Sequence, residues 1–413
     1  MPKNILLENL DQPEILEQAY HNSPQEFEEH LKGAIEKNHD SETLRVWNAR
    51  LSYCPSASPH KISVGLLVVF CLIAGVVIKT PYFLPIDGQW FYPRFVPLVV
   101  IASLIAYFIK TTAPRLTALK VVISGVAISF VYLAVLPDSR SSASITMALI
   151  HLPMFSLSLL AYSFMSEEWM SVESRLNFIR YLGEMGIYVV LILLGGMVLT
   201  AITLGLFNLI GLSIENWYME YIVVLGLTSS PLVATYLFDA IQNRQSRFAS
   251  MLSNVFSPLF LITVLAYLVA TLYQGKSPFT DRDFLITFNG LLIVILALTI
   301  FSISGKKKGT GVTVSDYINV SLIGATLIIN LVALLAIFFR WAEYGVTVNR
   351  VVVTGANIII FVHLILLLRP YFSHIMHGEG LGTLEATVAK YLPVYTFWSL
   401  IVAVFLPLAF GFQ

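Results

Sequence analysis

Charged residues are scarce in this chain of 413 residues, since Asp, Glu, Lys and Arg make up 12% of it, against about 25% in soluble domains. Hydrophobic residues make up 57%. Most of such a chain cannot face water, which excludes an ordinary soluble protein. The zero net charge excludes a generally basic nucleic-acid-binding protein, and the apolar content excludes disorder. The composition therefore indicates a multi-pass membrane protein.

Cysteines and catalytic motifs are also scarce. The two cysteines, Cys54 and Cys71, imply neither a disulfide framework nor a thiolate metal site. The sequence contains no CxxC, HExxH, P-loop or serine nucleophile elbow. We therefore expect no enzyme activity, cofactor or metal. His374, His377 and Glu379 come nearest to a metal site, but a flexible polar loop explains them better because a further ligand is missing.

Residues 1–60 form an acidic segment with ten acidic and five basic side chains, whereas residues 61–413 carry 15 acidic and 20 basic ones. Ser23-Pro24-Gln25-Glu26 is typical of a capping box, with proline at the first helical position. The segment predicts a three-helix cytoplasmic cap, which is small for independent stability. We expect it to dock on the membrane domain, and it is also a candidate surface for a cytosolic protein partner.

Apolar stretches that suit the roughly 30 Å of bilayer hydrocarbon recur throughout residues 61–413. The sequence predicts an all-α fold with about eleven transmembrane helices. These stretches run over residues 62–78, 96–109, 118–137, 145–165, 185–210, 221–238, 256–273, 285–304, 317–339, 351–368 and 391–412.

The distribution of Lys and Arg predicts the orientation, because cytoplasmic loops are enriched in them. With the N-terminus inside, fifteen such residues near the membrane fall on the inner side and seven on the outer side. This predicts a cytoplasmic N-terminus and places Gln413 outside. Lys306, Lys307 and Lys308 in one inner loop are typical of a topology signal that contacts anionic lipid head groups.

Polar residues at membrane depth are the main indication of function, because a charge at the centre of a membrane helix costs roughly 2.5–3.5 kcal/mol. Arg180 and Glu184 lie one helical turn apart at the inner end of the fifth stretch, and Asn177 lies a turn away on the same face. The spacing predicts a direct pair that acts as a unit. It is either a gate or ion-coupling element, or a self-satisfied structural pair.

Other polar residues lie within the fourth, eighth, ninth and tenth stretches. His151 and His363 are candidates for a proton relay, although a histidine bonded to a backbone carbonyl and packed between helices explains each one better. Asn289, Asn330 and Asn357 suit either a solute site or interhelical hydrogen bonds.

Proline interrupts the sixth stretch beside two hydroxyl groups. Pro231 removes a backbone donor, so a kink with freed carbonyl groups is expected. Freed carbonyls beside Ser229 and Ser230 suit Na⁺ or a polar solute, as in transporters with broken helices. The neighbouring hydroxyl groups can equally satisfy those carbonyls.

Two weak internal matches suggest a five-plus-five inverted repeat. Phe95-Val96-Pro97-Leu98 matches Phe256-Ser257-Pro258-Leu259 at an offset of 161 residues. Pro231 matches Pro393 at an offset of 162. Shifted by this amount, the second to sixth stretches fall on the seventh to eleventh, and an odd number of helices per unit inverts the second copy.

Six motifs between residues 151 and 412 are Arg175–Glu184, Ser229–Tyr236, Phe256–Leu259, Tyr273–Asp283, Arg340–Arg350 and Lys390–Tyr395. With these motifs the chain resembles a bacterial family of multi-pass membrane proteins of unknown function, DUF four-one-five-three. The resemblance implies a bacterial inner-membrane setting and no assigned activity.

Two classes of function are compatible with these features. The better supported is a transporter or channel for a small solute or ion; the alternative is a non-transporting membrane sensor, regulator or assembly subunit that acts through residues 1–60. Substrate, coupling ion and oligomeric state stay open. The candidate path comprises Arg180, Glu184, Asn177, Ser229, Ser230, Pro231, Asn289, Asn330, His151 and His363.

Overall fold

The computed structural model of this chain describes residues 5–22, 27, 30–31, 33–35, 38, 41–52, 62–138, 142–241, 244, 247–274, 282–306, 311–378 and 380–413. Helices and loops make up this described part, with no strand in it. The chain divides into two compact units, residues 1–60 and 61–413. The predicted capping box at residues 23–26, together with Lys307, Lys308 and Glu379, lies outside the described residues.

The first unit contains the helices α1 (Ile5–Glu8), α2 (Pro13–Asn22) and α4 (Glu42–Ser52). Its small core contains a group of aromatic rings, in which Trp47 lies 4.7 Å from Phe27 and 5.6 Å from Tyr20 between ring centroids. Docking of this unit on the membrane domain stays a prediction. The buried apolar residues are Leu6, Leu16, Phe27, Leu31, Ala34, Leu44 and Trp47.

The second unit confirms the predicted helical membrane fold. Its described residues include ten helices that are long and apolar enough to span a bilayer, and α5 is a shorter apolar helix. Each of the eleven predicted stretches falls mainly within one of these helices. They are α5 (Val64–Ile78), α7 (Gly88–Thr112), α8 (Leu116–Val135), α9 (Ala143–Met165), α10 (Val172–Leu209), α12 (Val224–Tyr236, within a span that runs over Glu215–Asp239), α13 (Phe248–Gln274), α14 (Arg282–Ser304), α15 (Val314–Tyr344), α16 (Val348–His377) and α17 (Leu381–Leu400, within a span that runs over Leu381–Ala409).

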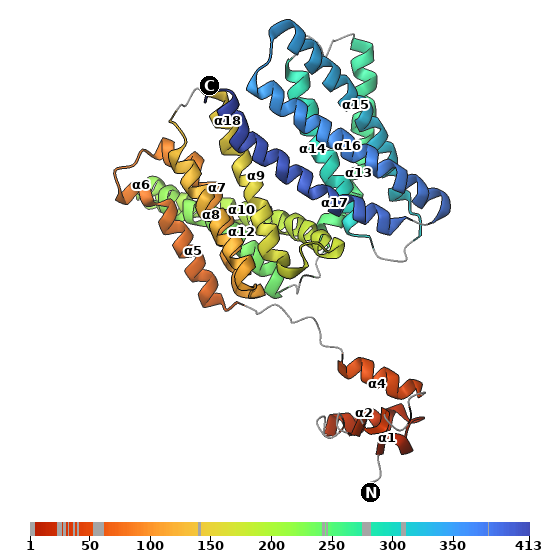
Figure 1. The fold of residues 1–413 in the computed structure, drawn as a ribbon. Coiled ribbons are helices and arrows are strands. Elements are labelled where there is room, and N and C mark those ends of the chain that lie inside the picture. Colours follow the sequence, from red (N-terminus) through yellow and green to blue (C-terminus); the bar gives the residue numbers. More distant parts are fainter. Residues whose placement is uncertain are drawn as a thin grey trace. The chain divides into compact units, whose positions relative to one another are not determined.

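The spanning helices form two groups joined by α10 and α17 (Figure 1). In one group α7 packs on α8, α9 and α5; in the other α13 packs on α14 and α15, and α15 packs on α16. The N-terminal part of α10 contacts the second group, whereas α17 crosses between α9 and α16. Residues from both groups therefore meet along α10 and α17.

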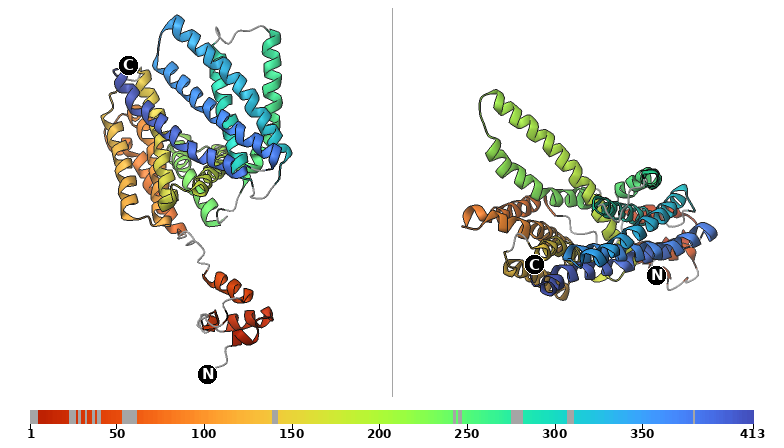
Figure 2. Two further views of the ribbon diagram at one scale, coloured as in Figure 1. Left: turned by 45° about the vertical axis from the view of Figure 1, so that its right-hand side comes forward. Right: turned by 90° about the horizontal axis from the view of Figure 1, so that it is seen from above.

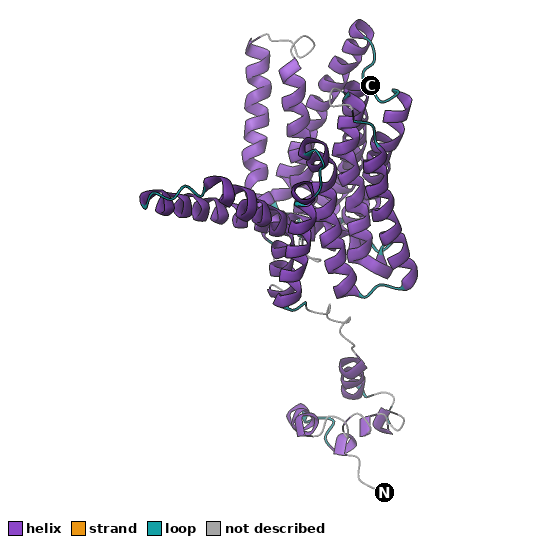
Figure 3. Cartoon of the chain, turned by 90° about the vertical axis from the view of Figure 1, so that its left-hand side faces the viewer, coloured by secondary structure: helices purple, strands orange, loops and turns teal. Residues whose placement is uncertain are grey.

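The C-terminal part of α10 extends beyond the bundle. Every buried residue of α10 lies between Ser174 and Glu184, so the apolar residues after Glu184 are at least partly exposed. The yellow-green hairpin in the right-hand view of Figure 2 and the arm in Figure 3 show this extension. Exposed apolar side chains of this kind suit a lipid environment.

The four prolines on which the predicted repeat is based lie inside helices. Pro97 and Pro258 lie within α7 and α13, and Pro231 and Pro393 lie within α12 and α17. Helix α12 continues into a π-helical segment at residues 237–241, and α17 continues into one at residues 401–405. The inverted repeat itself stays a prediction.

Candidate functional site

Arg180 binds the C-terminal end of α14. Its Nε donates a hydrogen bond to the carbonyl oxygen of Ser304, the last residue of that helix. Arg247 reaches the same helix end, where its Nη1 lies 3.4 Å from the carbonyl oxygen of Gly305. The C-terminal carbonyls of a helix lack intrahelical donors and carry partial negative charge, so a guanidinium is a favourable partner there.

Glu184 binds the N-terminal end of α13. Its Oε1 accepts a hydrogen bond of 2.7 Å from the backbone N–H of Ala249, the second residue of that helix. Only 1% of Glu184 is exposed. Gly183 permits this close approach, because a Cβ there would lie 2.7 Å from the Cβ of Ala249. An anionic side chain at a helix N-terminus is stabilised by the same helix polarity that favours Arg180 at the other end.

The predicted direct ion pair between Arg180 and Glu184 is absent from the described contacts, although both residues are described. Helical spacing brings the two side chains near each other, but neighbouring helix ends offer each of them a partner of its own. Asn177 behaves as its spacing predicts, since its Oδ1 accepts a hydrogen bond of 2.8 Å from Arg180 Nη1.

The hydroxyl groups around Pro231 satisfy the backbone locally. The carbonyl freed by Pro231 is that of Leu227, and Ser230 Oγ donates a hydrogen bond of 2.9 Å to it. Ser230 thus satisfies the broken turn, as in the alternative interpretation. Ser229 Oγ, in contrast, is buried without a hydrogen-bond partner among the described residues.

The two predicted histidines each have a hydrogen-bond partner at Nδ1, whereas Nε2 of His363 is buried without one among the described residues. His151 Nδ1 lies 2.9 Å from the carbonyl oxygen of Met147 in its own helix. His363 Nδ1 lies 2.8 Å from the hydroxyl of Tyr395, and its ring stacks on Tyr391 with centroids 4.2 Å apart. His363 therefore joins α16 to α17, as a packing histidine does.

The three asparagines converge between α14, α15 and α16. Asn357 Nδ2 donates a hydrogen bond of 2.9 Å to Asn289 Oδ1, and Asn330 Nδ2 donates one of 3.0 Å to the backbone oxygen of Asn357. Asn330 is fully buried, and its Oδ1 has no hydrogen-bond partner among the described residues. The cluster combines interhelical hydrogen bonds with one unused acceptor.

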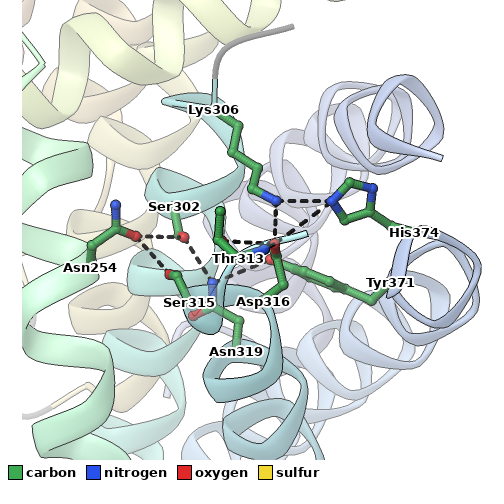
Figure 4. Close-up of polar contacts among 9 residues, drawn as sticks. All are labelled: Asn254, Ser302, Lys306, Thr313, Ser315, Asp316, Asn319, Tyr371 and His374. Atoms are coloured by element: carbon green, nitrogen blue, oxygen red, sulfur yellow. Dashed lines mark hydrogen bonds and ion pairs between the residues drawn. The ribbon is translucent and has the colours of Figure 1, made fainter. Parts of the chain in front are cut away.

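A buried charged network, which the sequence did not single out, lies at the ends of the same three helices (Figure 4). Lys306, which follows α14, places its Nζ 2.5 Å from Oδ2 of Asp316 on α15 and 3.0 Å from Nε2 of His374 on α16. His374 Nε2 also lies 3.7 Å from Asp316 Oδ2. Asp316 and His374 are each 1% exposed. One lysine thus contacts a buried carboxylate and a buried imidazole at once.

A separate set of polar contacts lies beside this network and reaches α13 (Figure 4). Asn319 Nδ2 donates to Ser302 Oγ at 2.8 Å, and Ser302 Oγ donates to Asn254 Oδ1 at 3.1 Å. Asn319 Nδ2 also lies 3.4 Å from the hydroxyl of Tyr371. Asn319 Oδ1 and His374 Nδ1 are buried without a partner among the described residues. Unused buried polar atoms carry a cost, so they point to a ligand or to another state of the site.

Local sequence explains where the charged groups stand. Asp316 is the third residue of α15 and forms a capping box with Thr313, whose backbone N–H and hydroxyl donate to Asp316 Oδ2 at 2.8 and 2.9 Å. His374 lies in the last turn of α16. Helix polarity favours an anion such as Asp316 at the start of α15 and a cation at the position of His374 at the end of α16.

Two interpretations of the sequence need correction here. Lys306 is not simply a topology signal at the lipid head groups, because its ammonium group binds a carboxylate inside the protein. His374 and His377 do not lie in a flexible loop, because α16 continues through both and ends at Gly378. The sequence signal for Asp316 was a Thr-x-x-Asp capping pattern, which by itself indicates only a helix start.

Another buried carboxylate, Asp239, lies in the other helix group. Asp239 Oδ2 accepts a hydrogen bond of 2.9 Å from the hydroxyl of Tyr107, and Asp239 Oδ1 binds Nε of Arg244. The guanidinium of Arg244 also lies 4.9 Å from the ring centroid of Phe164. Unlike Asp316, this carboxylate is paired with a single cation and has no imidazole within ion-pair distance among the described residues.

Comparison with protein families, curated proteins and solved structures finds no match for this chain. The resemblance to a bacterial membrane-protein family stays a prediction.

Proposed function

We propose that this protein is a transporter or channel for a small solute or ion in a bacterial inner membrane. The observation that carries the proposal is the Lys306–Asp316–His374 network, in which one carboxylate faces two basic groups inside a helical membrane protein. Ionisable groups buried in such proteins are costly, and they commonly mark ion or proton pathways.

The burial of Asp316, Asn319 and His374 shows that the structure holds the network in a closed state. Asp316, Asn319 and His374 are all at most 1% exposed, so the site is closed to solvent. A solute or ion could reach Asp316 only if α15 and α16 moved apart or Lys306 withdrew. The proposal therefore requires at least one further conformation with an open network, as alternating access does.

The uneven distribution of basic residues supports a cytoplasmic N-terminus and an outside C-terminus. In that orientation the Lys306 network lies at the cytoplasmic ends of α14, α15 and α16. The asparagine cluster lies deeper within the same helices, so its free acceptor at Asn330 Oδ1 suits a second position along a path.

Reconstitution of the full chain into liposomes tests this function. Gradients of Na⁺, K⁺, H⁺ and Cl⁻ are imposed in turn, and flux is recorded by ion-sensitive dyes. We expect flux above that of empty liposomes for at least one ion, and its loss in Asp316→Asn. Arg115→Gln is a matched control, because Arg115 forms a surface pair with Glu167 at 3.2 Å and its side chain is 79% exposed.

A second candidate function rests on the N-terminal unit. Residues 1–60 form a compact unit with a core of its own, which suits a non-transporting sensor, regulator or assembly subunit. If inserted protein carries no flux and residues 1–60 retain a cytosolic protein on an affinity column, this second function is favoured.

A further inference from the structure

We propose that His374 is a proton-binding site, and that its protonation exchanges Lys306 for His374 as the cation bound to Asp316. The inference rests on the proposed function only in making the proton the coupling ion. The exchange itself is a property of the folded protein and can be measured without transport.

Hydrogen-bond geometry shows which form of His374 the structure contains. An ammonium group has donors and no acceptor, so Lys306 Nζ at 3.0 Å requires a lone pair on His374 Nε2. The neutral ring then carries its proton on Nδ1, which is buried and has no acceptor among the described residues. In the lysine-bound state this buried N–H therefore has no partner within the described part of the chain.

A proton added to Nε2 reverses this contact. The new N–H would face the Lys306 ammonium, and two cations would then compete for one carboxylate oxygen. His374 Nε2 lies 3.7 Å from Asp316 Oδ2, so a small movement of the ring turns the contact into a charge-assisted hydrogen bond. Lys306 remains an ammonium ion and leaves the carboxylate.

Charge balance makes the exchange one for one. Before protonation the site holds one carboxylate and one ammonium group, and afterwards it holds one carboxylate and one imidazolium, so its net charge stays at zero. Retaining both cations would leave an uncompensated positive charge among buried groups, which is unfavourable. Lys306 can leave because its side chain is already 13% exposed, whereas those of Asp316 and His374 are each 1% exposed.

Besides Lys306 and Asp316, two titratable groups among the described residues of α16 and α17 have partners of their own. Tyr371, one turn earlier on α16, faces Asn319 and is a neutral phenol. Glu385 on the neighbouring helix α17 interacts with Arg180 of α10. The last turn of α16 favours a cation through its helix polarity, which supports imidazolium at this position.

Lysine acylation followed by peptide mass spectrometry tests the exchange on the full chain in detergent. Lys306 is compared with Lys110, an exposed lysine at the end of α7, so that the general loss of amine reactivity in acid cancels in the ratio. We expect the Lys306 to Lys110 ratio to rise at least about threefold between about pH 8 and about pH 5.5, a range that includes the charge change of a free imidazole.

Two variants separate this exchange from general loosening. His374→Gln keeps a polar side chain but cannot titrate, so its ratio should stay constant with pH. Asp316→Asn lacks the carboxylate that holds Lys306, so its ratio should be high at every pH. The proposal is overturned if the Lys306 to Lys110 ratio in the unmodified chain does not change with pH. It is also overturned if a folded His374→Gln shows the same rise as the unmodified chain. The first of these results does not depend on the folding of any variant.

Transport and proton binding can fail separately. If acidification raises the Lys306 to Lys110 acylation ratio but no flux is seen in liposomes, the proton site is supported and the proposed function is contradicted. Flux accompanied by a flat ratio removes the proton site and leaves the transporter.

Discussion

Arg180 and Glu184, one turn apart on α10, bind helix ends of opposite polarity rather than each other. Arg180 donates to the last carbonyl of α14, and Glu184 accepts from the second N–H of α13. A single turn of α10 thereby holds the ends of two adjacent helices. These contacts give each charge a packing role, and a role for Arg180 and Glu184 in a solute path stays a prediction.

This geometry predicts independent contributions to stability. Arg180→Gln and Glu184→Gln should each lower the free energy of unfolding by roughly 1–2 kcal/mol, because each removes a charged partner from a helix end. The losses should add to within about 0.5 kcal/mol because the two side chains have different partners, although they lie only one turn apart. Denaturant unfolding of the two single variants and the double variant measures the sum.

A strong departure from additivity would restore the direct pair that the helical spacing suggests. Arg180→Lys is the matched control, because lysine keeps the charge while losing the geometry of the guanidinium group.

The Lys306–Asp316 pair should show the opposite behaviour. Lys306→Gln or Asp316→Asn alone leaves a charge without its partner and should cost up to about 3 kcal/mol, toward the low end for buried pairs because Lys306 is partly exposed. The double variant removes the conflict and should cost less than the sum of the two single variants. Thermal unfolding in detergent measures this coupling, and additive losses would show that the pair contributes little.

Sequence patterns predicted the helices because the hydropathy of a segment depends on that segment alone. Each predicted apolar stretch falls mainly within a helix, although α10 begins at Val172, well before the predicted residue 185. The early start follows from polar residues such as Arg180 and Glu184, which lower the hydropathy of a turn but remain helical. Their partners lie on α13 and α14, and no local pattern reports which helices become neighbours.

The candidate site was harder to predict for the same reason. Lys306, Asp316 and His374 belong to three different helices, and each has an ordinary local explanation as a loop lysine, a capping residue or a loop histidine. Asn289, Asn330 and Asn357 were singled out as polar residues within apolar stretches, and the structure brings them together. What the sequence lacks is the register in which α14, α15 and α16 pack.

Topology gives a further prediction. The α5 helix has only 15 residues, which is about 22 Å at 1.5 Å per residue, but α6 (Thr80–Phe83) extends it. We expect α5 to cross the membrane, so that Gln413 lies outside. An alkaline-phosphatase fusion after Gln413 should be active and a cytoplasmic reporter at the same position inactive; the reverse pattern would show an even number of crossings.

The N-terminal unit gives a prediction about docking. The opposite net charges of residues 1–60 and residues 61–413 favour attraction that salt should weaken. Deletion of residues 1–50 should leave an inserted membrane domain with a lower melting temperature in low salt and a smaller difference in high salt. If the full chain and the deletion variant have the same melting temperature at both salt concentrations, the N-terminal unit does not contribute to the stability of the membrane domain.

The most direct test of the proposed function is the current that follows a pH step across liposomes containing the full chain. If the network around Asp316 carries protons with a net movement of charge, the unmodified chain and Arg115→Gln should give the same transient current, whereas Asp316→Asn should give none. Equal currents from the unmodified chain and a folded Asp316→Asn, or no current from correctly inserted unmodified protein, would contradict the account.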